Sequence, residues 1–277
     1  MPPAEFRNIL LARLAQPSDR NVTLYFTFLT FLGTESDTVM QSYARNAVIS
    51  DPADDAARTY LIDYSIHAGK FDEADYECRQ WMARKPLDYR PLLSIAMVRR
   101  LRRNFKDAIG MAESALKAHE SWRASADYVE RAGYDADIKK IWQELAFCHE
   151  SAGDLDRAVL YHKKIFDFSL EENNRTVDPS VYISLMEIYI RAKRYADARE
   201  FDRLAGRYRV FENLPGTNLR ILEESLAEDL TSALNKLIYV RILRINHPPA
   251  RAADLARKFA AEDPVFAAVW SDPGERP

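Results

Sequence analysis

One short phrase recurs four times along the chain: an aromatic residue or leucine follows turn-forming or polar residues and is itself followed, three residues later, by alanine. The four copies end at Ala74, Ala108, Ala158 and Ala198, so that the alanines lie 34, 50 and 40 residues apart. Self-similarity at a period of about 20 to 50 residues is typical of proteins built from stacked repeats. We therefore expect a row of similar units whose function resides on a surface rather than in a catalytic pocket.

Each copy of the phrase lies between two stretches of helical periodicity. For the first copy these are residues 57–68 and 73–84, which predicts a helix hairpin. An alanine three residues into the second helix leaves only a methyl group between the two helices and so permits close packing, whereas a larger side chain would push them apart. The apolar residues, 47% of the chain, show no long alternation of period two. The expected fold class is all-α.

The periodicity divides the chain into repeats and two ends. Residues 55–88 and 89–122 align without a gap, and Pro52 and Pro86 close successive units at the same position. The predicted repeat array covers residues 21–212, in the units 21–54, 55–88, 89–122, 139–172 and 179–212. A capping helix is expected within residues 1–20, and a helical cap within residues 213–277 with helices at 219–230, 233–245 and 250–261.

Two units carry the signature spacings of a known family. Unit 139–172 has them at Trp142, Leu145, Ala146, Gly153, Leu155 and Ala158, and unit 179–212 at Tyr182, Leu185, Tyr189, Tyr195 and Ala198. In these residues the chain resembles the tetratricopeptide repeat (TPR) family, over about two thirds of its length. Arg58 and Ser65 depart from the pattern, because they stand where the family has a large apolar residue and a tyrosine. The resemblance implies a right-handed α-solenoid of TPR-like helix hairpins with N- and C-terminal capping helices.

The charge balance excludes some partners. The chain has 39 basic and 42 acidic residues and a net charge of −3. This balance argues against non-specific electrostatic binding to nucleic acid or to an anionic membrane. The exception is a basic run of Arg99, Arg100, Arg102 and Arg103. It is either a solvated last turn of a helix, where cations are favoured, or a contact for phosphate or an acidic peptide.

The sequence contains no motif of a known catalytic, metal or nucleotide site, so we expect neither an enzyme nor a cofactor. His149 and His162 either pack as flat aromatic substitutes or form a pH-responsive pair or half of a metal site. Cys78 and Cys148 lack metal-ligand spacing and are expected to be buried as small hydrophobic residues.

The N-terminal residues lack the pattern of a signal peptide, and the longest apolar stretch, residues 23–32, is too short to span a bilayer. We expect a cytoplasmic protein with no integral membrane segment. Phe26 and Phe31 belong to a stretch that is apolar nearly all round. It is either covered by the N-terminal helix or forms a contact between subunits.

The resemblance also implies a binding surface, because the first helices of TPR hairpins line a concave groove. The residues at groove positions are Asp63, His67, Arg90, Met97, Arg100, Lys140, Gln143, Phe147, Glu150, Glu187 and Arg191. Met97 and Phe147 between basic residues favour a peptide or helix with apolar anchors and acidic residues. The predicted function is that of an adaptor or scaffold binding another protein; the alternatives are a structural subunit of a homo- or hetero-oligomer and a regulatory accessory protein of an enzyme.

Overall fold

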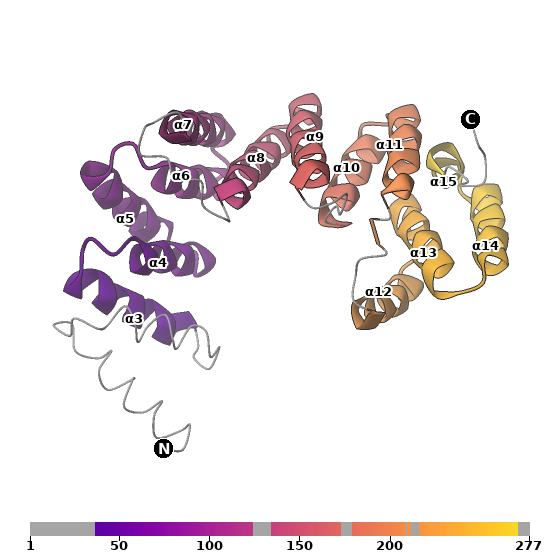
Figure 1. The fold of residues 1–277 in the computed structure, drawn as a ribbon, viewed down its shortest axis with the longest axis horizontal. Coiled ribbons are helices and arrows are strands. Elements are labelled where there is room, and N and C mark those ends of the chain that lie inside the picture. Colours follow the sequence, from indigo (N-terminus) through magenta and orange to yellow (C-terminus); the bar gives the residue numbers. More distant parts are fainter. Residues whose placement is uncertain (1–36, 124–133, 173–178, 209, 212–215, 271–277) are drawn as a thin grey trace, which may run out of the picture. The chain divides into compact units, whose positions relative to one another are not determined.

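A computed structural model of the chain describes residues 37–123, 134–172, 179–208, 210–211 and 216–270. Over these residues it contains thirteen α-helices and no strand, and most consecutive helices within each compact unit pack on each other (Figure 1). The prediction of an all-α fold of stacked helix hairpins is confirmed. The expected capping helix within residues 1–20 lies outside the described residues, as do Phe26 and Phe31, for which cover by that helix and a contact between subunits were the alternatives.

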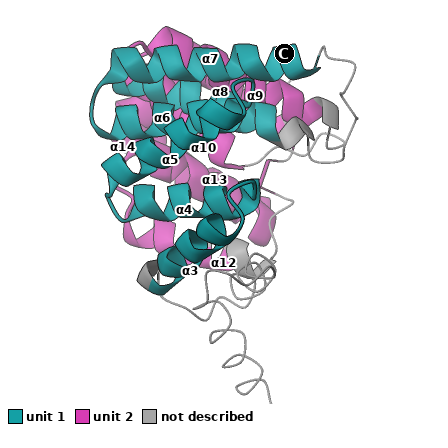
Figure 2. Cartoon of the chain, turned by 90° about the vertical axis from the view of Figure 1, so that its left-hand side faces the viewer, with its two compact units in different colours: residues 1–152 teal, residues 153–277 magenta. Residues whose placement is uncertain are grey.

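The chain forms two compact units, residues 1–152 and 153–277 (Figure 2). The division falls inside the predicted repeat 139–172, between its two helices. The first unit contains α3 (Asp37–Ser50), α4 (Asp55–His67), α5 (Phe71–Arg84), α6 (Tyr89–Leu101), α7 (Phe105–Arg123) and α8 (Tyr134–Ser151). Each of these helices packs on the next, and α6 also contacts both α4 and α8. The first helices of successive hairpins therefore lie side by side.

The second unit contains α9 (Leu155–Glu172), α10 (Pro179–Arg191), α11 (Tyr195–Arg207), α12 (Gly216–Glu228), α13 (Ala233–Asn246), α14 (Pro249–Glu262) and α15 (Pro264–Val269). Here α9, α10 and α11 pack in sequence, and α12 to α15 form a second group that joins them through contacts of α13 with α10 and of α15 with α11. Helices are present at the three places expected in the C-terminal part, but the six-residue α15 was not predicted from the sequence.

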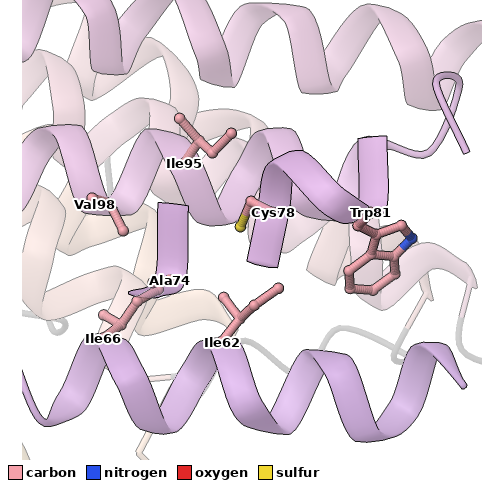
Figure 3. Close-up of a cluster of buried hydrophobic side chains, with 7 residues drawn as sticks. All are labelled: Ile62, Ile66, Ala74, Cys78, Trp81, Ile95 and Val98. Atoms are coloured by element: carbon pink, nitrogen blue, oxygen red, sulfur yellow. The ribbon is translucent and has the colours of Figure 1, made fainter. Parts of the chain in front are cut away.

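The alanines of the recurring phrase are buried between the helices. Ala74, Ala108, Ala158 and Ala198 each have no exposed surface, as their predicted role requires. Figure 3 shows the first of these cores, where Ala74, Cys78 and Trp81 of α5 lie between Ile62 and Ile66 of α4 and Ile95 and Val98 of α6. The second helix of this hairpin is thus packed on both sides by first helices.

A shared turn geometry joins the two helices of each hairpin. Gly69 and Gly153 have positive φ angles of 70° and 82°, and Arg103 and Lys193 take the same left-handed conformation at the equivalent position, with φ of 60° and 57°. In the first turn the Gly69 amide donates to the Ile66 carbonyl at 3.0 Å and the next amide donates to the Ser65 carbonyl at 2.7 Å. This pair of bonds is the Schellman motif, which satisfies carbonyls at the end of the first helix.

Buried polar groups fix the relation of helices in the second unit. The Tyr182 hydroxyl of α10 donates to Asp202 of α11 at 2.8 Å, and the Arg241 guanidinium of α13 binds both oxygens of the same carboxylate. Asp202 has no exposed surface, and Arg241 also lies over the ring of Trp270 at 4.8 Å from its centroid. Burial raises the pKa of the Tyr182 hydroxyl well above its usual value, which keeps it protonated as a donor. One carboxylate thus connects three helices.

The close contact at Ala198 can be tested against a neighbouring alanine in the same helix. Ala198→Leu should lower the free energy of unfolding by about 1–3 kcal/mol, because the added atoms have no room between α10 and α11. Ala196 lies two residues earlier in α11 and is exposed, so Ala196→Leu should change stability by less than about 0.5 kcal/mol. Urea denaturation of both variants measures the difference, and equal stabilities would contradict the proposed packing role.

The two non-glycine turns predict a gain in stability. A left-handed residue other than glycine costs about 1–2 kcal/mol, and part of this is offset by the greater freedom of glycine in the unfolded chain. Arg103→Gly and Lys193→Gly should each therefore raise the free energy of unfolding by about 0.5–1 kcal/mol in denaturant titrations. Gly69→Ala should lower it by about 1 kcal/mol through the backbone alone, since a Cβ there meets no atom within 4 Å. Arg103→Ala is the control, because it removes the charge but retains the strain.

Candidate functional site

Nine of the predicted groove residues lie on three helices of the first unit that contact one another through α6. We call this surface the first-helix face, and it consists of Asp63 and His67 on α4, Arg90, Met97 and Arg100 on α6, and Lys140, Gln143, Phe147 and Glu150 on α8. The four residues of α8 follow one another at intervals of three, four and three, which places them along one side of that helix. The local helical periodicity and the packing of α6 between α4 and α8 thus assemble the face.

The centre of the first-helix face is apolar and half-buried. Met97 packs against the core cluster that contains Ile62 and Ile66 of α4. Phe147 is half-buried on α8, and the Arg100 guanidinium lies over its ring at 5.4 Å from the centroid. A partner would therefore find two partly accessible apolar side chains, one of them under the flat surface of a cation.

Arg100 is held by a carboxylate inside the protein. Its Nε and Nη2 donate to the two oxygens of Glu144 on α8 at 2.7 and 3.0 Å. Glu144 is buried, and the thiol of Cys148 lies 3.5 Å from one of its oxygens. Burial raises the pKa of the Cys148 thiol to about 12, so this cysteine is not a reactive thiolate. The bidentate pair joins α6 to α8.

Arg90 is held in a similar way at the other end of α6. Its guanidinium pairs with Asp88, at the N-cap of α6, and with Asp55 in the first turn of α4, and it lies over the Trp81 ring at 4.7 Å. Lys85 pairs with the same Asp55 carboxylate at 2.6 Å. The positive charge of Arg90 is therefore matched within the protein, and this arginine ties α4 to α6.

Asp63 and Lys140 come from helices on opposite sides of α6. Asp63 is exposed, but the surrounding protein removes part of its hydration and raises the pKa of its carboxyl group, while the charges of His67 and Lys140 act in the opposite direction. Because α4 and α8 each contact α6, these two side chains belong to neighbouring parts of the first-helix face.

The other two predicted groove residues belong to the second unit. Glu187 and Arg191 are both exposed on α10, four residues apart. They belong to a different compact unit from the nine residues of the first-helix face.

The basic run lies at the end of α6, and three of its four arginines pair with carboxylates of other helices. Arg99 donates to Asp75 at 2.8 Å and Arg102 to Asp72 at 2.6 Å, both on α5, while Arg100 binds Glu144. These three arginines therefore make ion pairs between helices, while Arg102 and Arg103 are exposed, as expected for a solvated end of a helix. Sequence reasoning missed the pairs because the partners are 24 to 44 residues away along the chain.

The histidines and cysteines considered for a chemical role are buried in the core. His149 and His162 are 1% and 2% exposed, which agrees with a packing role, and Cys78 and Cys148 are buried free thiols as predicted. In the portion of the chain that the structure describes, no group of three or more His, Cys, Asp or Glu residues is placed to hold a metal ion. Within the same portion, no helix has both the length and the apolar character needed to cross a bilayer.

Comparisons with known proteins support the fold. No protein-family model and no curated protein matches the sequence. Among solved structures, Pseudomonas aeruginosa PilF is similar with a TM-score of 0.53 at 16% identity, over 91% of this chain and 96% of that one. A structure of Naa15/Naa10 bound to HypK-THB matches with a TM-score of 0.41 at 14% identity, over 91% of this chain and 38% of that one. PilF contains TPR repeats, so this likeness and the hairpin geometry define a helical-repeat protein of TPR-like fold.

The ion pair between Arg100 and Glu144 predicts a strong difference between single and double variants. Arg100→Met should lower the free energy of unfolding by about 3 kcal/mol or more, because it leaves a buried carboxylate unpaired. The double variant Arg100→Met with Glu144→Leu should recover most of that loss, since no buried charge remains. Denaturant titration of the wild type and the single and double variants gives the coupling energy. A double variant as unstable as Arg100→Met alone would contradict a structural role for the pair.

Proposed function

We propose that this protein is a non-enzymatic adaptor or scaffold that binds a peptide or helix of a partner protein on the first-helix face. The observation that carries the proposal is that α6 contacts both α4 and α8, which joins the three helices into one surface that bears Met97 and Phe147. Such a surface, with Met97 and Phe147 as partly exposed apolar anchors and polar residues around them, suits a segment of another polypeptide. The likeness to PilF supports the fold on which this proposal depends.

The internal ion pairs also support a binding role, because they hold the face in one arrangement. Arg90 ties α4 to α6, and Arg100 ties α6 to α8 and covers Phe147. A surface that is already ordered loses less conformational entropy when a partner binds. The same pairs make Arg90 and Arg100 poor positions for a binding test, because their substitution would disturb the fold itself.

The proposal can be tested with a photo-reactive amino acid at exposed positions that take no part in the fold. Placed at Gln143 on α8, it should form a covalent adduct with a partner protein in the cells that produce the chain. Placed at Lys117, exposed on α7 outside the first-helix face, it should form none. Mass spectrometry of the adduct identifies both the partner and the cross-linked segment.

A second variant connects the adduct to the face. Lys140 is 67% exposed in its side chain, and its ion pair with Asp137 is long at 3.5 Å, so Lys140→Glu should leave thermal unfolding unchanged. It should nevertheless change the amount of adduct formed from Gln143 several-fold, because it reverses a charge beside the bound segment. Adducts that form equally from Lys117, or that are indifferent to Lys140→Glu, would count against the first-helix face as the binding surface.

A further inference from the structure

We propose that the partner segment presents a basic side chain, lysine or arginine, to Asp63. This inference rests on the proposed function and specifies the chemistry of its ligand. It replaces the expectation, drawn from Arg90, Arg100 and Lys140 in the sequence, that the partner would be acidic at this surface.

The reason is how the charges of the first-helix face are matched. Arg100 is bound by Glu144, and Arg90 by Asp55 and Asp88, so neither arginine offers a free positive charge to a ligand. Lys140 is largely solvated and has Asp137 at 3.5 Å. The cations that favoured an acidic partner are thus engaged within the protein or exposed to water, where their attraction is screened.

Asp63 differs from the other carboxylates around it. Asp55, Asp88, Asp137 and Glu144 each accept from a basic side chain. Within the described ranges, the carboxylate of Asp63 takes part in no hydrogen bond or ion pair; the bond from His67 at 2.8 Å goes to its backbone carbonyl. An unmatched negative charge therefore remains on the face, and a cation is the group that complements it.

The surroundings of Asp63 strengthen this preference. The protein around the carboxyl group disfavours its charged form, which is why its pKa is raised. A basic group placed within hydrogen-bonding distance would replace the lost hydration and stabilise the carboxylate, whereas an acidic group would be repelled. The charge of Lys140 acts on Asp63 from too far to form an ion pair, so the position remains open.

The neighbouring side chains suit the length of lysine or arginine. Ile62 and Ile66, next to Asp63 along α4, belong to the core cluster on which Met97 of α6 packs, and Met97 is half-buried. The methylene stem of a lysine or arginine can lie along an apolar surface while its charged end reaches a polar group. Met97 and Asp63 offer these two features on α6 and α4, which contact each other.

A random peptide library displayed on phage and panned against the full chain tests this preference directly. The wild type should enrich peptides with lysine or arginine at one fixed position near apolar residues. Asp63→Asn should lose that preference and bind a synthetic peptide of the enriched sequence about five- to tenfold more weakly. Asp63→Lys should select aspartate or glutamate at the same position. Glu120→Gln, which removes an exposed carboxylate from α7, is the matched control and should behave as the wild type.

The outcomes separate this inference from the proposed function. Enriched peptides that block photo-cross-linking from Gln143 but carry no common basic residue, or that bind Asp63→Asn unchanged, would overturn the inference and leave the proposed function standing. Peptides that bind without affecting the cross-link from Gln143 would contradict both. Failure to enrich any peptide on the wild type would also count against both, because an ordered peptide-binding face should select ligands from such a library.

Discussion

The close approach of paired helices across an alanine methyl group is the contact on which the other features of this structure depend. Ala74, Ala108, Ala158 and Ala198 are completely buried, so each second helix lies close against its neighbours. In the first unit α5 is thereby packed between α4 and α6, and α6 is brought into contact with both α4 and α8. The first-helix face exists because these contacts recur, and any residue larger than alanine in them would change the spacing of its side chains.

Ion pairs between neighbouring helices determine the position of one helix along the next. Arg58 pairs with Glu77, and Arg99 with Asp75, across adjacent helices, while Arg100 reaches α8. The energy of apolar packing changes little when one helix is displaced slightly along another. A hydrogen-bonded charge pair, in contrast, requires particular atoms to lie within bonding distance. A buried ion pair contributes little net stability, because the desolvation of its charges offsets their attraction. We therefore infer that the main effect of these pairs is to position the helices. That assignment explains why so many arginines of a protein with little net charge are engaged internally.

The repeats were predictable from the sequence because the residues that specify them are close together in it. The turn residue, the aromatic and the alanine lie within six positions, and Gly69 and Gly153 mark the left-handed position that Arg103 and Lys193 share. What could not be predicted was the environment of single side chains. Arg58 looked like a departure from the repeat pattern, yet it is buried and paired with a residue 19 positions away. The placement of the groove residues on α4, α6 and α8 followed from the repeat pattern, but which of their charges were already matched did not.

The distinction between engaged and free charges determines what a repeat protein of this kind can recognise. Residue type alone made the first-helix face seem basic, because it contains Arg90, Arg100 and Lys140. Once each cation is set beside its partner, little free positive charge remains, and within the described residues the carboxylate of Asp63 takes part in no hydrogen bond or ion pair. Residues that hold helices in register cannot vary freely without loss of the fold, so the choice of partner must depend on the few side chains that the fold does not use. On this face Asp63 and Gln143 are exposed and Met97 and Phe147 are partly accessible, and changes at these positions can alter binding while the alanine contacts and ion pairs remain intact.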